Sequence, residues 1–252
     1  MSDDVFRFAF ITDSQIGMNS PFGLDGPGSD KARLDSAIAH VNANEIDFVV
    51  FGGDQINDAD TEETDAQLDA FETSVAALKV PHYGVIGNHE QGRPSGTWKY
   101  IERGLPVRFS MTHKSLFMVG AHGTYLRADF GEENWQAEWD CLETALSGAP
   151  AGCEHRFVVM HWPLMNYHPG EAESYWNVSR RGKLIELFKR HGVSCVLSGH
   201  WQQDIDANWQ GISLITSVGT SKTLQYPEEL SFKVFTVFEG GWSARRVSVE
   251  KI

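Results

Sequence analysis

The sequence has few cysteines, and none of them has the spacing of a zinc or redox motif. The 252 residues include 3 cysteines, which are Cys141, Cys153 and Cys195. The absence of a Cys-x-x-Cys pair excludes a zinc knuckle and a thioredoxin-type motif. The odd number and wide spacing argue against a disulfide framework, so we expect a reducing compartment.

Positive charge is also scarce. The chain has 21 lysines and arginines against 34 aspartates and glutamates, which gives a net charge of −13. Binding to nucleic acids or to anionic membranes depends on lysine and arginine close to phosphates. We therefore expect neither a nucleic acid nor a membrane as partner. A small phosphate ester stays possible, because bound metal ions can reverse the field of an acidic site.

The sequence lacks a long apolar run, an internal repeat and a low-complexity stretch. No segment approaches the roughly 20 apolar residues of a membrane span, and residues 1–7 do not resemble a signal peptide. We expect a cytoplasmic protein. With 41% hydrophobic residues and no linker-like break, residues 1–252 are expected to form a single domain. The sequence leaves the oligomeric state open.

Apolar patterning predicts an α/β protein. The first third alternates strands and helices, which is typical of a parallel sheet with crossover helices. Its expected elements are strand 5–12, helix 31–44, strand 46–51, helix 61–79 with Thr61 as its cap, and strand 81–86. Later expected elements are a hairpin from 107–111 and 116–121, helices 133–146 and 180–191, strands 156–160 and 193–197, and antiparallel strands 212–218, 232–238 and 242–249.

Five polar segments come directly after predicted strands. In open α/β sheets, the ligand site lies beyond the carboxyl ends of the strands. Carboxylate, amide and imidazole groups without thiolate are the ligand set of hard or borderline divalent metals. The segments are Asp13-Ser14-Gln15, Gly53-Asp54-Gln55-Ile56-Asn57, Gly87-Asn88-His89-Glu90, His161-Trp162-Pro163 and Gly199-His200-Trp201-Gln202.

Each segment alone also has an ordinary structural interpretation. An aspartate after a strand is commonly a turn former or a helix cap, and a lone histidine is commonly a packing residue. The Gly87-Asn88-His89-Glu90 segment is more specific, and the order of all five segments is the decisive feature.

This order resembles the calcineurin-like metallophosphoesterase superfamily, whose pattern is Asp-x-His, Gly-Asp, Gly-Asn-His-[Asp/Glu], His and Gly-His-x-His. The resemblance implies a four-layer α/β fold, in which two packed mixed β-sheets are flanked by helices. It also implies two divalent metals that share a bridging aspartate and a bridging hydroxide. Residues 173–179, 187–188, 192–193 and 198–200 look like the branch of calcineurin-like phosphoesterase domain-containing protein 1, which is associated with protein phosphatase activity.

The resemblance assigns roles to individual residues. Asp54 would bridge the metals, Asn88 and His89 would bind substrate, and His89 would be the acid near the leaving oxygen, supported by Glu90 or Asn57. One metal would be held by Asp13, Gln15, Asp54 and Gln202, and the other by Asp54, Asn88, His161 and His200.

Gln15 and Gln202 stand where the family pattern has histidine, and both belong to the same metal site. An amide oxygen is a weaker and harder ligand than imidazole. We therefore expect this site to bind more weakly than the other. Among manganese, iron, zinc and magnesium, we expect manganese to be favoured.

The leading prediction is a metal-dependent phosphoric ester hydrolase that acts on a small-molecule or peptide phosphate ester. A phosphomonoesterase or protein phosphatase is favoured. The alternatives are a phosphodiesterase acting on nucleotides, a degenerate one-metal member with a binding or regulatory role, and a metal-free α/β protein whose polar loops serve turns alone.

Overall fold

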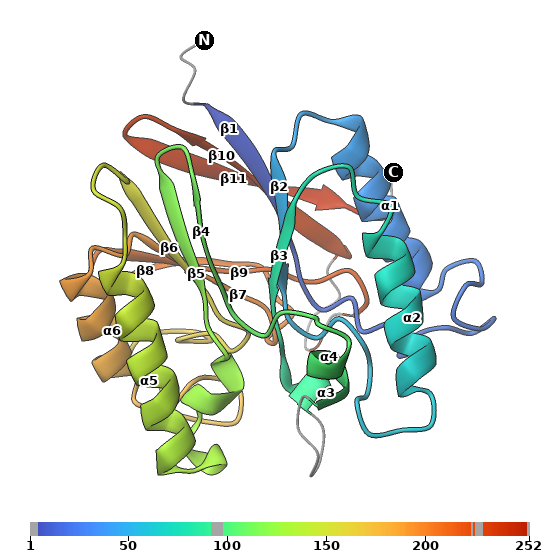
Figure 1. The fold of residues 1–252 in the computed structure, drawn as a ribbon, viewed down its shortest axis with the longest axis horizontal. Helices are drawn as coiled ribbons and strands as arrows, with labels where there is room; N and C mark the ends of the chain where they lie inside the picture. The colour runs from blue at the N-terminus through green and yellow to red at the C-terminus, as the bar shows by residue number, and fades with distance from the viewer. Residues whose placement is uncertain (1–4, 92–97, 223, 225–228, 251–252) are drawn as a thin grey trace.

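The computed structural model describes residues 5–91, 98–222, 224 and 229–250. Two β-sheets lie face to face, and helices cover the outer side of each sheet (Figure 1). The expected α/β fold with two packed mixed sheets flanked by helices is confirmed.

The first sheet has the strand order β11-β10-β1-β2-β3. Strands β1, β2 and β3 run parallel to one another, whereas β10 pairs antiparallel with β1 and with β11. Helices α1 (Asp30–Ala43) and α2 (Thr64–Val75) lie on its outer side (Figure 1). The strands are β1 (Phe6–Ile11), β2 (Phe48–Gly52), β3 (His82–Val85), β10 (Ser231–Phe238) and β11 (Gly241–Ser248).

The second sheet has the strand order β4-β5-β6-β7-β9-β8. Strands β5, β6, β7 and β9 are parallel, and β4 and β8 are antiparallel edges. Helices α5 (Glu132–Ser147) and α6 (Arg181–Arg190) lie on its outer side (Figure 1). The strands are β4 (Phe109–His113), β5 (Leu116–Gly120), β6 (His155–Val159), β7 (Cys195–Ser198), β8 (Ile205–Trp209) and β9 (Ile212–Thr216).

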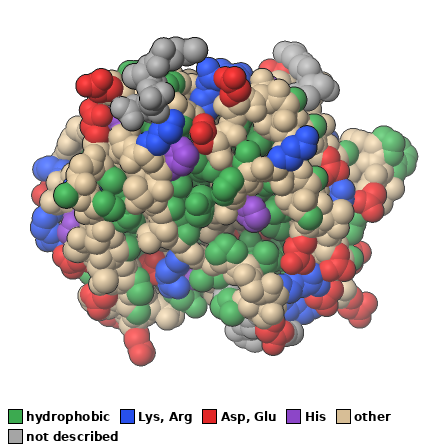
Figure 2. Space-filling model, turned by 45° about the horizontal axis from the view of Figure 1, so that its top comes forward, with side chains coloured by type: hydrophobic (Ala, Val, Ile, Leu, Met, Phe, Trp, Pro, Cys, Tyr) green, Lys and Arg blue, Asp and Glu red, His purple; other side chains and the backbone are tan. Residues whose placement is uncertain are grey.

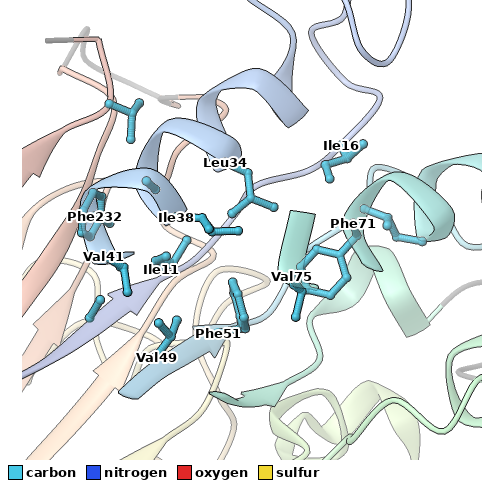
Figure 3. Close-up of a cluster of buried hydrophobic side chains, with 14 of the residues drawn as sticks. Ile11, Ile16, Leu34, Ile38, Val41, Val49, Phe51, Phe71, Val75 and Phe232 are labelled. Atoms are coloured by element: carbon cyan, nitrogen blue, oxygen red, sulfur yellow. The ribbon is translucent and has the colours of Figure 1, made fainter. Parts of the chain in front are cut away.

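Apolar side chains fill the three spaces between the four layers. Between the sheets, the Phe8 ring stacks on Phe48 and Phe235, with centroid distances of 5.1 and 4.7 Å. Between α1, α2 and the first sheet, Leu34 and Ile38 belong to a buried cluster (Figure 3). A third cluster packs α5 and α6 on the second sheet. This burial holds the strand ends in fixed positions.

The structure differs from the predicted elements in several places. Helix α2 begins at Thr64, whose side-chain oxygen accepts a hydrogen bond from the Thr61 amide, so Thr61 is not the cap. Strand β8 was not predicted. It is a half-exposed edge strand in which polar side chains alternate with apolar ones. Strand β9 pairs in parallel with β7, although we expected only antiparallel pairing after residue 212. The short helices α3 (Asn88–Gln91) and α4 (Trp98–Glu102) and the 3₁₀ turns Gly123–Leu126 and Ala128–Phe130 were also not predicted.

The charged groups do not form one patch on the face shown in Figure 2. Hydrophobic side chains gather in the middle of that face, and acidic and basic side chains lie mainly around its edge. Within the described ranges, no helix combines the length and apolar character needed to cross a membrane.

Candidate metal centre

The predicted ligands come together at the carboxyl ends of strands from both sheets. Asp13 follows β1, Asp54 follows β2, and Asn88 begins α3 just after β3. His161 and His200 follow β6 and β7 of the second sheet. Nε2 of His161 lies 3.0 Å from Oδ2 of Asp54, so the two sheets meet at this point.

The backbone is left-handed at five of the seven predicted ligands. Asp13, Gln15, Asp54, His200 and Gln202 have φ angles between 38° and 59°. Residues other than glycine rarely adopt this region, and such strain concentrates at functional sites. The neighbouring loops are tight as well, because a Cβ at Gly87 would overlap the Asp54 carboxylate, and one at Gly199 would overlap that of Asp13.

One group of side chains has the geometry of a metal site. Ligand atoms of Asp54, His161 and His200 all lie within 4.8 Å of one another, and all three residues are buried. Nδ1 of His161 lies 2.8 Å from the Gly52 carbonyl oxygen, which fixes the ring with Nε2 toward Asp54. This is the arrangement by which a backbone carbonyl selects the ligating tautomer of a histidine.

Buried polar atoms without hydrogen-bond partners fit a metal at this place. Oδ1 of Asn88 and Nε2 of His200 are such atoms. Leaving a buried polar atom unpaired costs about 1–3 kcal/mol, so these atoms need a partner that the described side chains do not supply. Oxygen and imidazole nitrogen are ligands of divalent metals, and the residues therefore fit the metals that the sequence resemblance implies.

The side chains of the other predicted site bond to one another instead. Nε2 of Gln202 donates to Oδ1 of Asp13 at 3.1 Å and to Oε1 of Gln15 at 3.2 Å. Oδ2 of Asp13 accepts from the Thr12 hydroxyl at 2.6 Å and from the His200 amide at 3.2 Å. The structure thus brings Asp13, Gln15 and Gln202 together. Their side-chain polar atoms have hydrogen-bond partners, except Oε1 of Gln202.

His89 lies at the rim of the centre and is part-exposed. Its Nδ1 contacts the backbone oxygen of Asn57, and its Nε2 lies 3.2 Å from Nε2 of Gln15 and 3.8 Å from Oδ2 of Asp54. Of the two supports that we expected for this ring, the backbone of Asn57 contacts it. Glu90 instead accepts hydrogen bonds from the amides of Asp54, Ile56 and Gly87.

Three buried carboxyl groups, those of Asp13, Asp54 and Glu90, lie in the centre, and the Asp54 carboxylate shifts the pKa of the other two. Burial, together with the nearby Asp54 carboxylate, raises the pKa of Asp13 to about 6, although His161 opposes the shift. Burial also acts to raise the pKa of Asp54, but the imidazoles of His161 and His89 outweigh it and lower the pKa. Burial and then Asp54 raise the pKa of Glu90 to about 7. A bound cation would relieve this crowding.

The histidines respond to the same charges. Burial lowers the pKa of His161, but the Asp54 carboxylate outweighs this effect and raises it to about 9. His89 behaves alike, since Asp54 and the Asn57 carbonyl raise its pKa against burial. Burial, followed by repulsion from His161, lowers the pKa of His200 well below its usual range.

Sequence patterns did not reveal the loop that covers the centre. Nη1 of Arg127 donates to the carbonyl oxygens of Ser174, Tyr175 and Asn177 at 3.1, 2.5 and 3.2 Å. Its guanidinium also lies 5.4 Å from the ring centroid of Trp162. Arg127 thereby fixes residues 174–177 beside the ligands. No motif marks Arg127, because these contacts join segments about 50 residues apart.

Trp162 and Trp201, which directly follow His161 and His200 in the sequence, are buried beside the candidate ligands. The Trp162 ring lies 4.6 Å from the His200 ring, and the Trp176 ring lies 5.5 Å from it.

A family model described as calcineurin-like phosphoesterase matches residues 6–204. The chain belongs to this family of metallophosphoesterases. The match includes all five motif segments, from Asp13 to Gln202.

Curated relatives have two different activities in their names. The serine/threonine-protein phosphatase CPPED1 of Danio rerio is 37% identical over 65 residues, which cover 25% of this chain and 21% of that protein. The Rattus norvegicus protein of the same name is 31% identical over 85 residues and is covered over 27% of its length. The 3′,5′-cyclic adenosine monophosphate phosphodiesterase CpdA of Escherichia coli K12 is 24% identical over 94% of this chain and 83% of its own.

Solved structures share the fold over nearly the whole chain. The match to a dimetal phosphatase from Danio rerio covers 98% of this chain and 97% of the phosphatase chain, with a TM-score of 0.72 and 16% identity. The match to a purple acid phosphatase from yellow lupin covers 98% of this chain and 52% of the lupin chain, with a TM-score of 0.70 and 14% identity.

Proposed function

We propose that the chain is a metal-dependent phosphomonoesterase, or a protein phosphatase-like enzyme, whose centre is Asp54 with its neighbours. The observation that carries the proposal is the buried group of Asp54, His161 and His200 beside the part-exposed His89. Such a group combines metal ligands with a histidine able to transfer a proton at neutral pH.

Two metals of unequal affinity fit the residues. Asp54, Asn88, His161 and His200 would hold one metal, and Asp13, Gln15, Asp54 and Gln202 would hold a weaker second one, with manganese favoured. When bound, the metals would lower the pKa of water and offset the negative charge of the phosphoryl oxygens.

His89 is proposed to deliver the proton that the departing alcohol needs. Its Nδ1 faces the Asn57 carbonyl, so Nε2, which lies 3.2 Å from Nε2 of Gln15, is the ring nitrogen on the side of the candidate ligands. An imidazole titrates near neutral pH, which suits His89 to hold a proton for the leaving oxygen. Asn88 and His89 together would bind the substrate phosphate, because both line the cavity over the ligands.

Two other candidate functions each have one supporting observation. The match to the phosphodiesterase CpdA over 94% of this chain favours a diesterase acting on nucleotides. The hydrogen bonds of Gln202 to Asp13 and Gln15 favour a one-metal member with a binding or regulatory role.

Hydrolysis of matched aryl esters tests the proposal. The metal-stripped full chain would be reloaded with manganese and assayed on p-nitrophenyl phosphate and on bis-p-nitrophenyl phosphate. We expect the monoester to be preferred and Asp54→Asn to abolish its hydrolysis. Glu45→Gln is the matched control, because this exposed acid precedes β2 at the end opposite to Asp54. A preference for the diester would favour the phosphodiesterase.

The remaining proposals concern the whole chain. We propose that residues 1–252 act as a single domain, since side chains from both sheets form one buried cluster. We also propose a cytoplasmic location, which the three free cysteines support.

A further inference from the structure

A glutamine of helix α2 holds the backbone beside His89. Gln67 lies in the first turn of α2 and is only 1% exposed. Its Oε1 accepts hydrogen bonds from the amides of Asn57 and Asp58 at 3.0 and 3.1 Å. Because a backbone N–H can only donate, the side-chain atom that faces both amides must be the oxygen. None of the five motif segments includes Gln67.

The peptide group that bonds to Gln67 also holds His89. The N–H of Asp58 and the C=O of Asn57 belong to one peptide unit, and in a trans peptide they point in opposite directions. Gln67 accepts from the N–H on one side, and on the other side the carbonyl oxygen contacts Nδ1 of His89. A carbonyl oxygen can only accept, so Nδ1 must carry the proton of this hydrogen bond.

Hydrogen bonds therefore connect α2 with the candidate acid through a single peptide. The bond to Gln67 polarises this peptide, which makes the Asn57 carbonyl a stronger acceptor for His89. It also fixes the peptide plane, because a rotation that broke it would turn the carbonyl away from the ring. With Nδ1 held in this way, Nε2 of His89 stays 3.2 Å from Nε2 of Gln15, on the side of the candidate ligands.

The Gln67 side chain is itself held in place by packing. Gly17, which has a φ angle of 106°, lies against it, since a Cβ at Gly17 would come within 2.8 Å of Nε2 and 2.9 Å of Cδ of Gln67. The Asn57 amide also donates to the Ile16 carbonyl oxygen at 3.1 Å, which joins the loops that follow β1 and β2. Gln67 is therefore fixed between these two loops.

We propose that Gln67 is a positioning residue for proton transfer, which acts on His89 through the peptide between Asn57 and Asp58. The inference rests on the proposed role of His89 as the acid for the leaving oxygen. Gln67 is not among the described residues that line the cavity over the ligands, so its effect on the reaction passes through His89 rather than through contact with substrate.

Esters with different leaving groups test the inference. The manganese-loaded full chain would be assayed on glycerol 2-phosphate, whose leaving alkoxide needs a proton, and on p-nitrophenyl phosphate, whose leaving group needs little. Gln67→Met removes the acceptor and keeps a side chain of similar length. We expect kcat on the alkyl ester to fall by about tenfold, and kcat on the aryl ester by less than about twofold.

Three further comparisons separate positioning from a loss of stability. Gln67→Glu keeps an oxygen at the same place and should retain hydrolysis of the alkyl ester. Val75→Ala, at the other end of α2, removes buried apolar contacts and should leave the ratio of the two rates unchanged. In the His89→Ala background, Gln67→Met should change the alkyl rate by less than about twofold, because the residue through which it acts is gone.

A role in folding alone would have a different signature. Gln67→Met would then slow both esters equally, or would slow the alkyl ester as much in the His89→Ala background as in the unaltered chain. Either result would overturn the inference and leave the proposed function intact, because p-nitrophenyl phosphate would still be hydrolysed by the unaltered chain.

The hydrogen bond gives a second readout that needs no activity. In NMR spectra of the metal-stripped chain with isotope-labelled histidine, the Nδ1–H of His89 should give a signal protected from exchange, assigned by its loss in His89→Ala. Nδ1 of His161, 2.8 Å from the Gly52 carbonyl oxygen, provides an internal reference. We expect Gln67→Met to remove the His89 signal and to keep that of His161.

This readout decides the inference even if no ester is hydrolysed and the proposed function fails. Loss of the His89 signal in Gln67→Met, with its retention in Gln67→Glu, would support the connection from Gln67 to His89. A His89 signal that persists in Gln67→Met, or that is missing from the unaltered chain, would overturn it.

Discussion

The Gln202 amide nitrogen lies 3.1 Å from Oδ1 of Asp13, and it donates a hydrogen bond to that carboxylate. Oε1 of Gln202 is buried without a partner. The NH₂ group cannot bind a cation, so Gln202 could ligate a metal beside Asp13 only through this oxygen. Asp54, His161 and His200 instead offer two imidazole nitrogens beside the carboxylate, so the two sites should differ in affinity.

Replacing both glutamines with histidine should remove this difference. We expect Gln15→His with Gln202→His to tighten the weaker site by at least about tenfold, or about 1.4 kcal/mol, and to shift its preference toward zinc or iron. Each single variant should do part of this. Metal titration of the stripped protein, followed by calorimetry, measures the two steps. Two equally tight zinc sites in the unaltered protein would refute the account of unequal sites.

His89→Ala should affect esters according to their leaving groups. His89 is not a proposed ligand, so metal content should stay intact. Hydrolysis of alkyl phosphates should slow by roughly 10²–10⁴, because an alkoxide needs the proton that His89 supplies. Nitrophenyl phosphate should lose much less, since its leaving group needs little protonation. If both kinds of ester slow equally, His89 serves binding rather than proton transfer.

Metal binding should release a proton from His161. In the metal-free protein, Asp54 raises the pKa of His161 to about 9, so the ring is protonated at pH 7. Nε2 must lose this proton to bind a metal. We expect about one proton released per first metal at pH 7, with affinity that rises with pH and levels off above pH 9. Calorimetry in buffers of different ionisation enthalpy measures the release, and a heat independent of the buffer would contradict the assignment.

Arg127→Met should loosen the loop over the centre. Arg127 is buried, and its side chain donates to three backbone carbonyls of residues 174–177. We expect the free energy of unfolding to fall by roughly 3 kcal/mol, because buried acceptors lose a charged partner. Arg190→Met is the control, since the exposed Arg190 pairs with the half-exposed Glu143 and should matter much less. Urea denaturation compares the two, and similar losses would argue against a special role for Arg127.

Much of the fold could be predicted because apolar runs of strand and helix length alternate clearly. Strand β8 was missed because it is a short edge strand, in which the apolar Ile205, Ala207 and Trp209 are only half-buried and alternate with polar side chains. The predicted start of α2, with Thr61 as its cap, was misplaced, because the helix begins at Thr64 after Glu63 and the Thr61 amide donates to the Thr64 side-chain oxygen.

The proximity of the candidate ligand residues could be predicted, because strand ends meet at one edge and the order of the motifs places each residue at such an end. The left-handed backbone at Asp54 and His200 could not, because it depends on how the turns pack together. The bonds among Asp13, Gln15 and Gln202 depend on side-chain orientation, which sequence spacing does not encode.

The rate of p-nitrophenyl phosphate hydrolysis across a manganese titration of the metal-stripped chain tests the central claim most directly. The account predicts a rate that rises with manganese, falls on dialysis against a chelator, returns when manganese is restored, and is absent in Asp54→Asn at every concentration. Glu45→Gln should follow the unaltered chain throughout. A rate that stays at background under manganese, magnesium, zinc and iron would contradict the claim that this centre hydrolyses phosphate esters.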